Sequence, residues 1–289
     1  MELRVLTYFL TVAKEKNISR AAKVLHLSQP TLSKQLKELE NELGVTLFTR
    51  GNREITLTEE GNYLKQRGEE ILSLVQSTTS NLMSEDVIGG QLMIGSGETR
   101  GFQIVASVVN EMHREYPSIK CNLYSGNADE ITRKIDEGLL DFGLVIDPVQ
   151  KEKYDCFKLP YNETWGVLLN KEHPLASNVA LTADNLLTIP LFISNQAMVE
   201  NQIKEWQGNN IPLNIIGFYN LLYNASLLCH DPTVGILCID GIINTTNTDL
   251  CFVELSPKLQ ASLNLIWKKD TVLSNTAKMF LKKIENIQL

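Results

Sequence analysis

The chain has 289 residues, of which 43% are hydrophobic and 21% are charged, and its net charge at pH 7 is −7. These values predict a globular protein of two or three domains and exclude a disordered chain, a collagen-like repeat or a disulfide-rich mini-protein. No window of about 18 apolar residues predicts a membrane span, and residues 1–17 lack the pattern of a secretory signal, so we expect a cytoplasmic protein.

Residues 1–58 form a basic head on an acidic remainder. They hold 9 Lys and Arg against 6 Asp and Glu, a net charge of +3, whereas residues 59–289 hold 18 against 28, a net charge of −10. This asymmetry permits a nucleic-acid contact that is confined to one end of the chain.

Apolar residues at helical spacing predict two helices at the start of this head. The first helix carries Leu3, Leu6 and Leu10 on one buried face. The second helix is short, and its paired alanines, Ala21 and Ala22, allow a neighbouring helix to approach closely.

A third helix is predicted after a short break at residues 26–28. Ser28 is a good N-cap, and Gly44 provides a C-cap. One face carries four leucines at helical spacing: Leu32, Leu36, Leu39 and Leu43. The opposite face carries polar groups: Gln29, Thr31, Ser33, Lys34 and Lys37. Two helices joined by a turn of about three residues, the second with a polar face, are typical of a helix-turn-helix that docks in the major groove of DNA.

Two short strands, at 47–50 and 53–57, are predicted around a turn at Gly51-Asn52. Arg50 and Arg53 lie near the tip of this hairpin, which makes it a wing able to contact phosphates or enter a minor groove. The residues expected at base edges are Gln29, Pro30, Thr31, Ser33 and Lys34. The residues expected at phosphates are Lys34, Lys37, Arg50 and Arg53. From the pattern alone, a small helical bundle with solvated polar faces is the alternative.

The segment from Ile18 to Gly61 resembles the N-terminal signature of the LysR-type transcriptional regulators. The resemblance is carried by Ala21-Ala22, Ser28-Gln29-Pro30, Ser33, Leu39-Glu40, Leu43-Gly44, Leu47-Phe48, Arg50, Arg53 and Leu57-Thr58-x-x-Gly61. It implies a winged helix-turn-helix domain over residues 1–58, double-stranded DNA as a partner, and a homodimer or homotetramer. RNA polymerase is a further partner that the resemblance admits.

Residues 59–88 are predicted to form a linker and dimerisation helix. Thr58 can cap this helix, and the acidic Glu59 and Glu60 suit its first turn. A seam at steps of four and three residues resembles a short coiled coil and consists of Leu64, Gly68, Ile71, Val75, Thr78 and Leu82. The alternative is an amphipathic helix that packs on its own chain. Gly89-Gly90 mark the boundary to the next domain.

Residues 89–289 are predicted to form a two-lobed α/β domain. Apolar strands at 91–95, 119–123 and 141–146 alternate with helices at 102–116 and 128–138, which predicts a largely parallel sheet with helices on its faces. A second series of strands is predicted at 164–169, 189–193, 213–218, 234–239 and 263–267. A closing helix is predicted at 271–287, with Val272, Met279, Phe280 and Ile284 turned inward.

This half also resembles the effector-binding domain of the same family, a fold shared with periplasmic binding proteins. The motifs are Gln91-Leu92-Met93-Ile94-Gly95, Tyr116-Pro117, Gly138-x-x-Asp141 and His173-Pro174-Leu175-Ala176. The resemblance implies a first lobe at 91–161 and 268–289, a second lobe at 162–267, and a small-molecule effector between them. The sequence departs from the family at 223–239, where Cys229-His230-Asp231-Pro232-Thr233 replace a glycine-rich turn, so the identity of the effector is not carried over.

Three loops that follow strands, at 96–100, 125–127 and 194–196, are predicted to face the ligand. Open α/β sheets bind ligands beyond the carboxyl ends of their strands, where helix N-termini offer N–H groups to anions. The residues expected to line the cleft are Ser96, Thr99, Asn127, Phe192, Ser194, Asn195 and Tyr219. Arg100 is expected to supply charge to a ligand carboxylate. Helix capping is the alternative role of the polar residues, and a solvated surface position is the alternative for Arg100.

Enzyme signatures are absent from the sequence. The four histidines are scattered, no H-E-x-x-H or G-x-S-x-G occurs, and the glycines at 95, 97 and 101 miss the dinucleotide-binding spacing by one residue. Five cysteines without a C-x-x-C pair are expected to be reduced core thiols. We therefore predict a regulator without catalytic residues, metal or cofactor. A solute-binding protein whose N-terminal head binds a protein partner is the second hypothesis.

Overall fold

The computed structural model describes residues 1–50, 55–82, 89–147, 149–150, 152–208 and 211–287. The chain divides into two compact units, Met1–Met83 and Ser84–Leu289. The division falls inside the segment 59–88 that the sequence predicts to be a linker.

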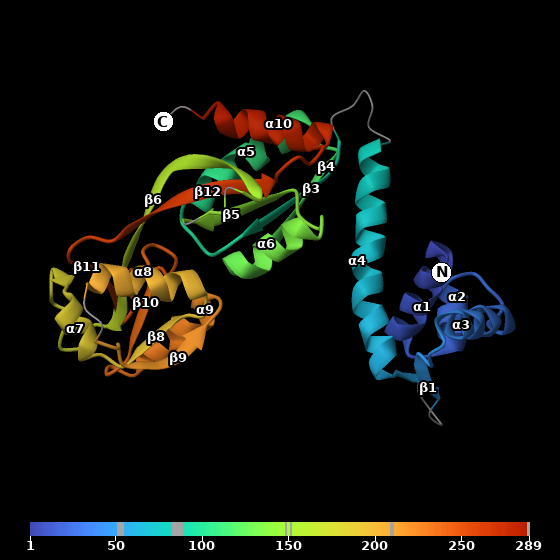
Figure 1. The fold of residues 1–289 in the computed structure, drawn as a ribbon, viewed down its shortest axis with the longest axis horizontal. Coiled ribbons are helices and arrows are strands. Elements are labelled where there is room, and N and C mark those ends of the chain that lie inside the picture. Colours follow the sequence, from blue (N-terminus) through green and yellow to red (C-terminus); the bar gives the residue numbers. More distant parts are fainter. Residues whose placement is uncertain (51–54, 83–88, 148, 151, 209–210, 288–289) are drawn as a thin grey trace. The chain divides into compact units, whose positions relative to one another are not determined.

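The first unit is a winged helix-turn-helix. Its elements are α1 (Leu3–Glu15), α2 (Ile18–Val24), α3 (Gln29–Leu43), β1 (Phe48–Arg50), β2 (Ile55–Leu57) and α4 (Glu59–Leu82) (Figure 1). The expected caps of α3 are present, since the Ser28 hydroxyl accepts a hydrogen bond from the Thr31 N–H and Gly44 adopts φ 70° at the helix end. Apolar side chains of α1, α2 and α3 are buried against one another, among them Phe9, Ala21 and Leu32.

The wing is a two-stranded antiparallel sheet in which Phe48 pairs with Leu57 and Arg50 with Ile55. Arg53 and the predicted turn at Gly51-Asn52 lie outside the described residues, and of Arg50 only the backbone is described.

Helix α4 packs on its own chain over its first half, which the coiled-coil interpretation did not predict. Leu64 contacts the core of the first unit, and Gly68 lies against Leu6 and Leu10 of α1. These two seam positions are therefore occupied within one chain. Ile71 and Leu74, further along the same helix, remain exposed.

The second unit is a two-lobed α/β domain. The first lobe contains β3 (Gly90–Ser96), α5 (Phe102–Glu115), β4 (Ile119–Ser125), α6 (Ala128–Asp136), β5 (Phe142–Ile146) and α10 (Asn275–Glu285). The second lobe contains β7 (Ala180–Leu181), α7 (Ala183–Leu187), β8 (Leu191–Ser194), α8 (Ala197–Gln207), β9 (Ile215–Tyr219), α9 (Leu222–Ser226), the 3₁₀ helix η1 (Leu227–His230), β10 (Gly235–Ile239) and β11 (Leu250–Leu255). Two long strands, β6 (Tyr154–Asn170) and β12 (Gln260–Lys268), run between the lobes (Figure 1).

The sheet is mixed: the strands predicted at 91–95, 119–123 and 141–146 pair in parallel as expected, whereas the crossing strands are antiparallel to their neighbours. The main strand order is β4-β3-β5-β12-β6-β10-β8-β9, in which β3 pairs in parallel with β4 and β5, and β8 with β9 and β10. The crossing strands differ, because β12 is antiparallel to β5 and β6, and β6 is antiparallel to β10 and β11. Each lobe thus keeps a parallel portion whose strands end at the same edge.

Each lobe has its own buried core. Val105, Phe142 and Phe280 pack in the first lobe, and Leu191 and Leu237 pack in the second. The closing helix is shorter than predicted: α10 begins at Asn275, with Ser274 as its N-cap. Val272 is therefore outside the helix and 91% exposed, contrary to the inward position expected of it.

Asp141 makes the stability of the second unit depend on pH. Its carboxylate accepts a hydrogen bond from the Met93 N–H at 2.8 Å, but burial raises the pKa of Asp141 to about 6. Between the unfolded pKa and about 6, the folded chain binds more protons than the unfolded chain, so this group lowers stability as pH rises through that window.

We expect Asp141→Asn to remove this dependence. The variant should be about 2 kcal/mol more stable than wild type at about pH 7 and nearly equal to it at about pH 4. Urea unfolding followed by tryptophan fluorescence measures the difference, since Trp165, Trp206 and Trp267 all lie in the second unit. An equal loss of stability at both pH values would show that the carboxylate itself is needed there.

Candidate functional site

One face of α3 is buried and the opposite face is polar and exposed. Leu32, Leu36 and Leu39 point into the core of the first unit. Of the predicted DNA-contacting residues on this helix, Gln29, Pro30, Thr31, Lys34 and Lys37 are exposed and Ser33 is half-buried. The helix period therefore separates the residues that anchor α3 from those that can reach a partner.

The turn before α3 fixes how this polar face is presented. His26 adopts φ 54°, and the Leu27 N–H donates to the Ala22 carbonyl at 2.9 Å, which closes the end of α2. Ala21 and Ala22 are buried between the helices. The first turn of α3 carries no acidic residue, so its positive helix end is not neutralised by a carboxylate of that turn.

The polar side chains of α3 are already partly ordered. The Gln29 Nε2 group donates to the Ser33 hydroxyl at 3.1 Å, and the Ser28 and Thr31 hydroxyls lie 2.7 Å apart. Lys34 lies 3.8 Å from Glu38 one turn on, and both side chains are more than half exposed. Such an exposed pair is weak, so the ammonium can leave Glu38 for a stronger anion.

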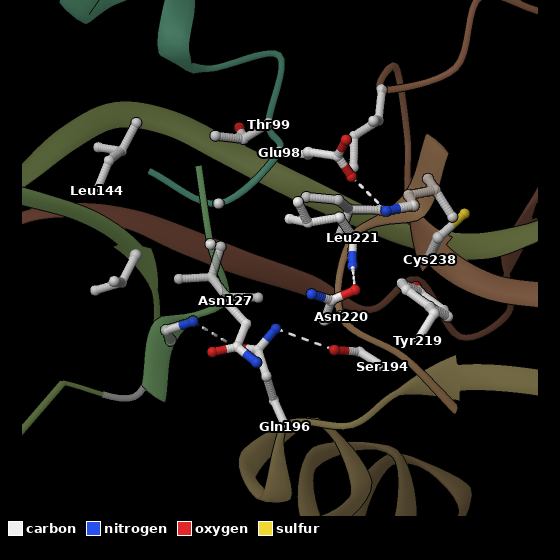
Figure 2. Close-up of a pocket in the computed structure, with 18 of the residues that line it drawn as sticks. Glu98, Thr99, Asn127, Leu144, Ser194, Gln196, Tyr219, Asn220, Leu221 and Cys238 are labelled. Atoms are coloured by element: carbon white, nitrogen blue, oxygen red, sulfur yellow. Dashed lines mark hydrogen bonds between the residues drawn. The ribbon is translucent and has the colours of Figure 1, made fainter. Parts of the chain in front are cut away.

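A cleft opens between the two lobes of the second unit, where the parallel strands β3, β4, β8 and β9 end (Figure 2). Four of the eight residues predicted for it line the cleft: Thr99, Asn127, Ser194 and Tyr219. The rule that ligands bind beyond the carboxyl ends of parallel strands thus places the cleft at the predicted loops.

The other four predicted residues lie outside the lining. The Ser96 hydroxyl donates to the Gly97 carbonyl, and the Phe192 ring packs on Gly217 of the adjacent strand. Arg100 is exposed, and its side chain lies against Gly241 rather than in the lining of the cleft. Asn195 is exposed, and its Oδ1 accepts a hydrogen bond from Asn127.

Three hydrogen bonds join the lobes across this cleft. Asn127 Nδ2 donates to Asn195 Oδ1, and the Ala128 N–H donates to Gln196 Oε1, both at 3.2 Å. The Leu222 N–H donates to the carboxylate of Glu98 (Figure 2). Sequence reasoning placed Glu98 and Gln196 in cleft loops but did not select either, although both carry polar groups at strand ends.

A buried carboxylate lies behind Thr99. The Thr99 hydroxyl donates to Glu163, whose side chain is on the long strand β6 and is 1% exposed. Burial raises the pKa of Glu163, the bond from Thr99 opposes the shift, and the charge of Asp240 adds to it. The Oε2 atom of Glu163 has no hydrogen-bond partner in the described part of the chain.

The five cysteines of the chain all lie in the second unit. Cys229 and Cys238 are buried, whereas Cys121, Cys156 and Cys251 are partly buried. Burial raises the pKa of Cys229 to about 12 and that of Cys121 to about 11. All five cysteines are free thiols, as the sequence predicts, although three of them are less buried than core residues. Among the described residues, no group of three or more His, Cys, Asp or Glu could hold a metal ion.

Comparison with known proteins agrees with this organisation. Residues 3–62 match the family model described as "Bacterial regulatory helix-turn-helix protein, lysR family", and residues 85–286 match the "LysR substrate binding domain". In the described part of the chain, no helix is long and apolar enough to span a membrane.

Two curated relatives illustrate the similarity. The Hca operon transcriptional activator HcaR of Escherichia coli is 31% identical over 281 residues, covering 93% of this chain and 92% of that protein. The HTH-type transcriptional regulator CzcR of Bacillus cereus is 26% identical over 290 residues, covering 99% of this chain and 97% of that protein.

Solved structures share the fold over the full length. CbnR, a LysR family transcriptional regulator, superimposes with a TM-score of 0.76 at 18% identity, covering 99% of this chain and 98% of that chain. Full-length CbnR in complex with its target DNA gives a TM-score of 0.75 at 18% identity, covering 99% of both chains. Because the family models match both units, and the HcaR relative extends over nearly the whole chain, the protein belongs to the LysR family of bacterial helix-turn-helix transcriptional regulators.

Proposed function

We propose that α3 docks in the major groove of a specific operator through its exposed polar face. The observation that carries this proposal is the division of α3 into a leucine face buried in the first unit and a polar face open to solvent. CbnR, which shares the fold, has been solved with its target DNA. The head has a net charge of +3, which favours a phosphate backbone, while the acidic remainder disfavours nonspecific coating of DNA.

In this proposal, one group of residues contacts base edges and another contacts phosphates. Base edges are read by Gln29, Pro30, Thr31, Ser33 and Lys34. Phosphates are neutralised by Lys34, Lys37, Arg50 and Arg53. We infer a homodimer that reads two half-sites about one helical turn, or a multiple of it, apart. Ile71 and Leu74 are among the exposed apolar residues in the described part of α4 that are available to a partner copy.

A small molecule bound between the lobes is inferred to modulate DNA binding or bending. The cleft joins two lobes that β6 and β12 connect, so a ligand that contacts both lobes favours one degree of closure. Its effect on DNA is limited to the difference between its affinities for the two states.

The relatives are named as transcriptional regulators, and catalysis forms no part of the proposed function. A bacterial regulator that binds chromosomal DNA acts in the cytoplasm, and we propose that location for this protein.

A footprint on the DNA upstream of the protein's own gene tests the proposal. We expect protection of two half-sites with helical periodicity, and affinity that falls steeply with salt. The absence of any shift or protection at low salt would contradict DNA binding and favour a protein partner for the head.

We expect Arg53→Ala to weaken binding to all DNA sequences by a similar factor. A wing residue at a phosphate contributes charge and no base readout. The negative slope of log K against log salt should therefore become shallower by about 0.9. Filter binding to the operator and to random DNA over a salt series measures this. Lys278→Ala, an exposed lysine of α10, is the matched control. A change in base preference alone would show that the wing is assigned wrongly.

A further inference from the structure

We propose that the cleft between the lobes recognises a small organic cation, with a protonated amine beside Glu98 and an apolar body against the walls, rather than an organic anion. This inference rests on the proposed role of the cleft as the effector site. It names the chemical class of the effector.

The charge of the lining favours a cation. Of the described residues that line the cleft, Glu98 is the one with a charged side chain, and none of them is Lys, Arg or His. The buried Glu163 lies directly behind Thr99 of the lining. The acidic Asp240 near it is offset by Arg100, whose side chain lies against Gly241. A ligand carboxylate in this cleft would lose hydrating water without gaining a cationic partner, which is unfavourable.

Three donors at the cleft are already engaged by the protein's own oxygen atoms. The Leu222 N–H donates to Glu98, the Ala128 N–H to Gln196, and the Thr99 hydroxyl to Glu163. Helix α6, whose N-terminus faces the cleft at Asn127, carries Asp129 and Glu130 in its first turn, which complement the helix dipole. These three donors and this helix end are therefore less available to an anionic ligand.

Two carboxylate oxygens at or near the cleft, in contrast, accept no hydrogen bond from the described residues. Glu98 uses Oε2 for the Leu222 N–H, and no hydrogen bond to its Oε1 occurs among the described residues. The Oε2 atom of the buried Glu163 is likewise without a partner there. An ammonium group supplies several donors and a positive charge, and it can bond Glu98 Oε1 without breaking the link between the lobes.

The size and walls of the cleft limit the rest of the ligand. The cleft has a volume of about 80 Å³, which suits a ligand of a few heavy atoms. Its apolar walls include Leu144, Trp165, Leu221 and Ile242. Figure 2 shows Leu144 and Glu98 from the first lobe and Leu221 from the second around this space.

Three probes with one carbon skeleton test the charge preference: n-butylamine, n-butanol and n-butyrate. Isothermal titration of the full-length protein measures each dissociation constant, with melting temperature as a second readout. We expect the amine to bind at least about tenfold more tightly than the alcohol, and butyrate to bind most weakly. Tighter binding of butyrate than of the amine, or no amine binding up to about 0.1 M, would overturn the inference.

A conservative substitution of Glu98 measures the contribution of its negative charge. Glu98→Gln keeps an oxygen for the Leu222 N–H and removes the charge, so the amine should lose its about tenfold advantage while butanol binding stays the same. Glu205→Gln, an exposed carboxylate on α8, is the control and should leave all three affinities unchanged. Unfolding by urea, followed through tryptophan fluorescence, verifies that Glu98→Gln folds. An amine preference that persists in Glu98→Gln would contradict the role of Glu98.

The footprint described above separates this inference from the proposed function. Operator protection together with a preference for butyrate would overturn the cation inference and leave the regulator intact. Amine binding without any DNA protection would contradict the proposed function and leave the recognition of cations by the cleft in place.

Discussion

Gly61→Ala is expected to unfold the first unit or to destabilise it by about 3 kcal/mol or more, because a side chain at this position has no space. A Cβ atom on Gly61 would overlap the carbonyl oxygen of Leu47, which belongs to the backbone and cannot rotate away. The Gly61 N–H also donates to the Thr58 hydroxyl at 2.9 Å, and the Thr58 N–H donates to the same Leu47 carbonyl. The start of α4 is thus held against the chain that enters the wing.

Gly68→Ala is the matched comparison, since Gly68 is also a buried glycine of α4. Its Cβ would lie 2.8 Å from Leu6 Cδ1, the end of a flexible side chain, and alanine favours a helix interior over glycine by about 1 kcal/mol. We therefore expect Gly68→Ala to change stability by less than about 1 kcal/mol.

Urea unfolding of both variants by circular dichroism measures the effect. Tryptophan fluorescence, which reports the second unit, should remain as in wild type. Equal stability of Gly61→Ala and wild type would show that the contact of α4 with Leu47 is looser than described.

The helix-turn-helix could be predicted in detail because its signals are local. Ser28 caps α3, Gly44 ends it, and the leucine spacing gives its buried face, all within one stretch of 17 residues. The seam of α4 was harder to assign, since Leu64 and Gly68 repeat as a coiled coil would, while α1 supplies their partner from elsewhere in the sequence. A spacing pattern identifies an apolar face and does not say what covers it.

The long strands were less accessible to prediction. Strand β6 spans 17 residues and serves both lobes, whereas the sequence pattern gave only its second half, at 164–169. Residues 154–158 and 162–164 pair with β12, a strand about a hundred residues further along the chain, so their partner is set by topology. Strand β11, which pairs with β6 and β7, was not predicted at all.

In the cleft, the loops could be predicted but the choice of side chains could not. Glu98 and Arg100 lie two residues apart in one loop, yet Glu98 reaches Leu222 across the cleft and Arg100 lies against Gly241. Which of two neighbouring side chains enters a cleft depends on loop conformation and on the opposite lobe. Neither can be inferred from spacing.

The double variant Lys34→Ala/Lys37→Ala is expected to lose about 10–100-fold in operator affinity at low salt. If each ammonium neutralises one phosphate, the slope of log K against log salt should become shallower by about 1.8 units. The apolar face of α3 does not include these positions, so the fold of the first unit should be preserved. Fluorescence anisotropy of labelled operator over a salt series gives both quantities, and circular dichroism verifies the fold.

Lys278→Ala/Lys282→Ala removes the same total charge from exposed positions of α10 and tests whether net charge alone explains the loss. This control should keep nearly the wild-type slope, because these lysines belong to the second unit and are not proposed to contact phosphates. Gln29→Ala should show the opposite pattern. Because the Gln29 amide carries no charge, the slope of log K against log salt should stay unchanged while the base preference changes. If Lys34→Ala/Lys37→Ala kept the wild-type slope, α3 would not lie along the phosphate backbone, and docking of its polar face in the major groove would be wrong.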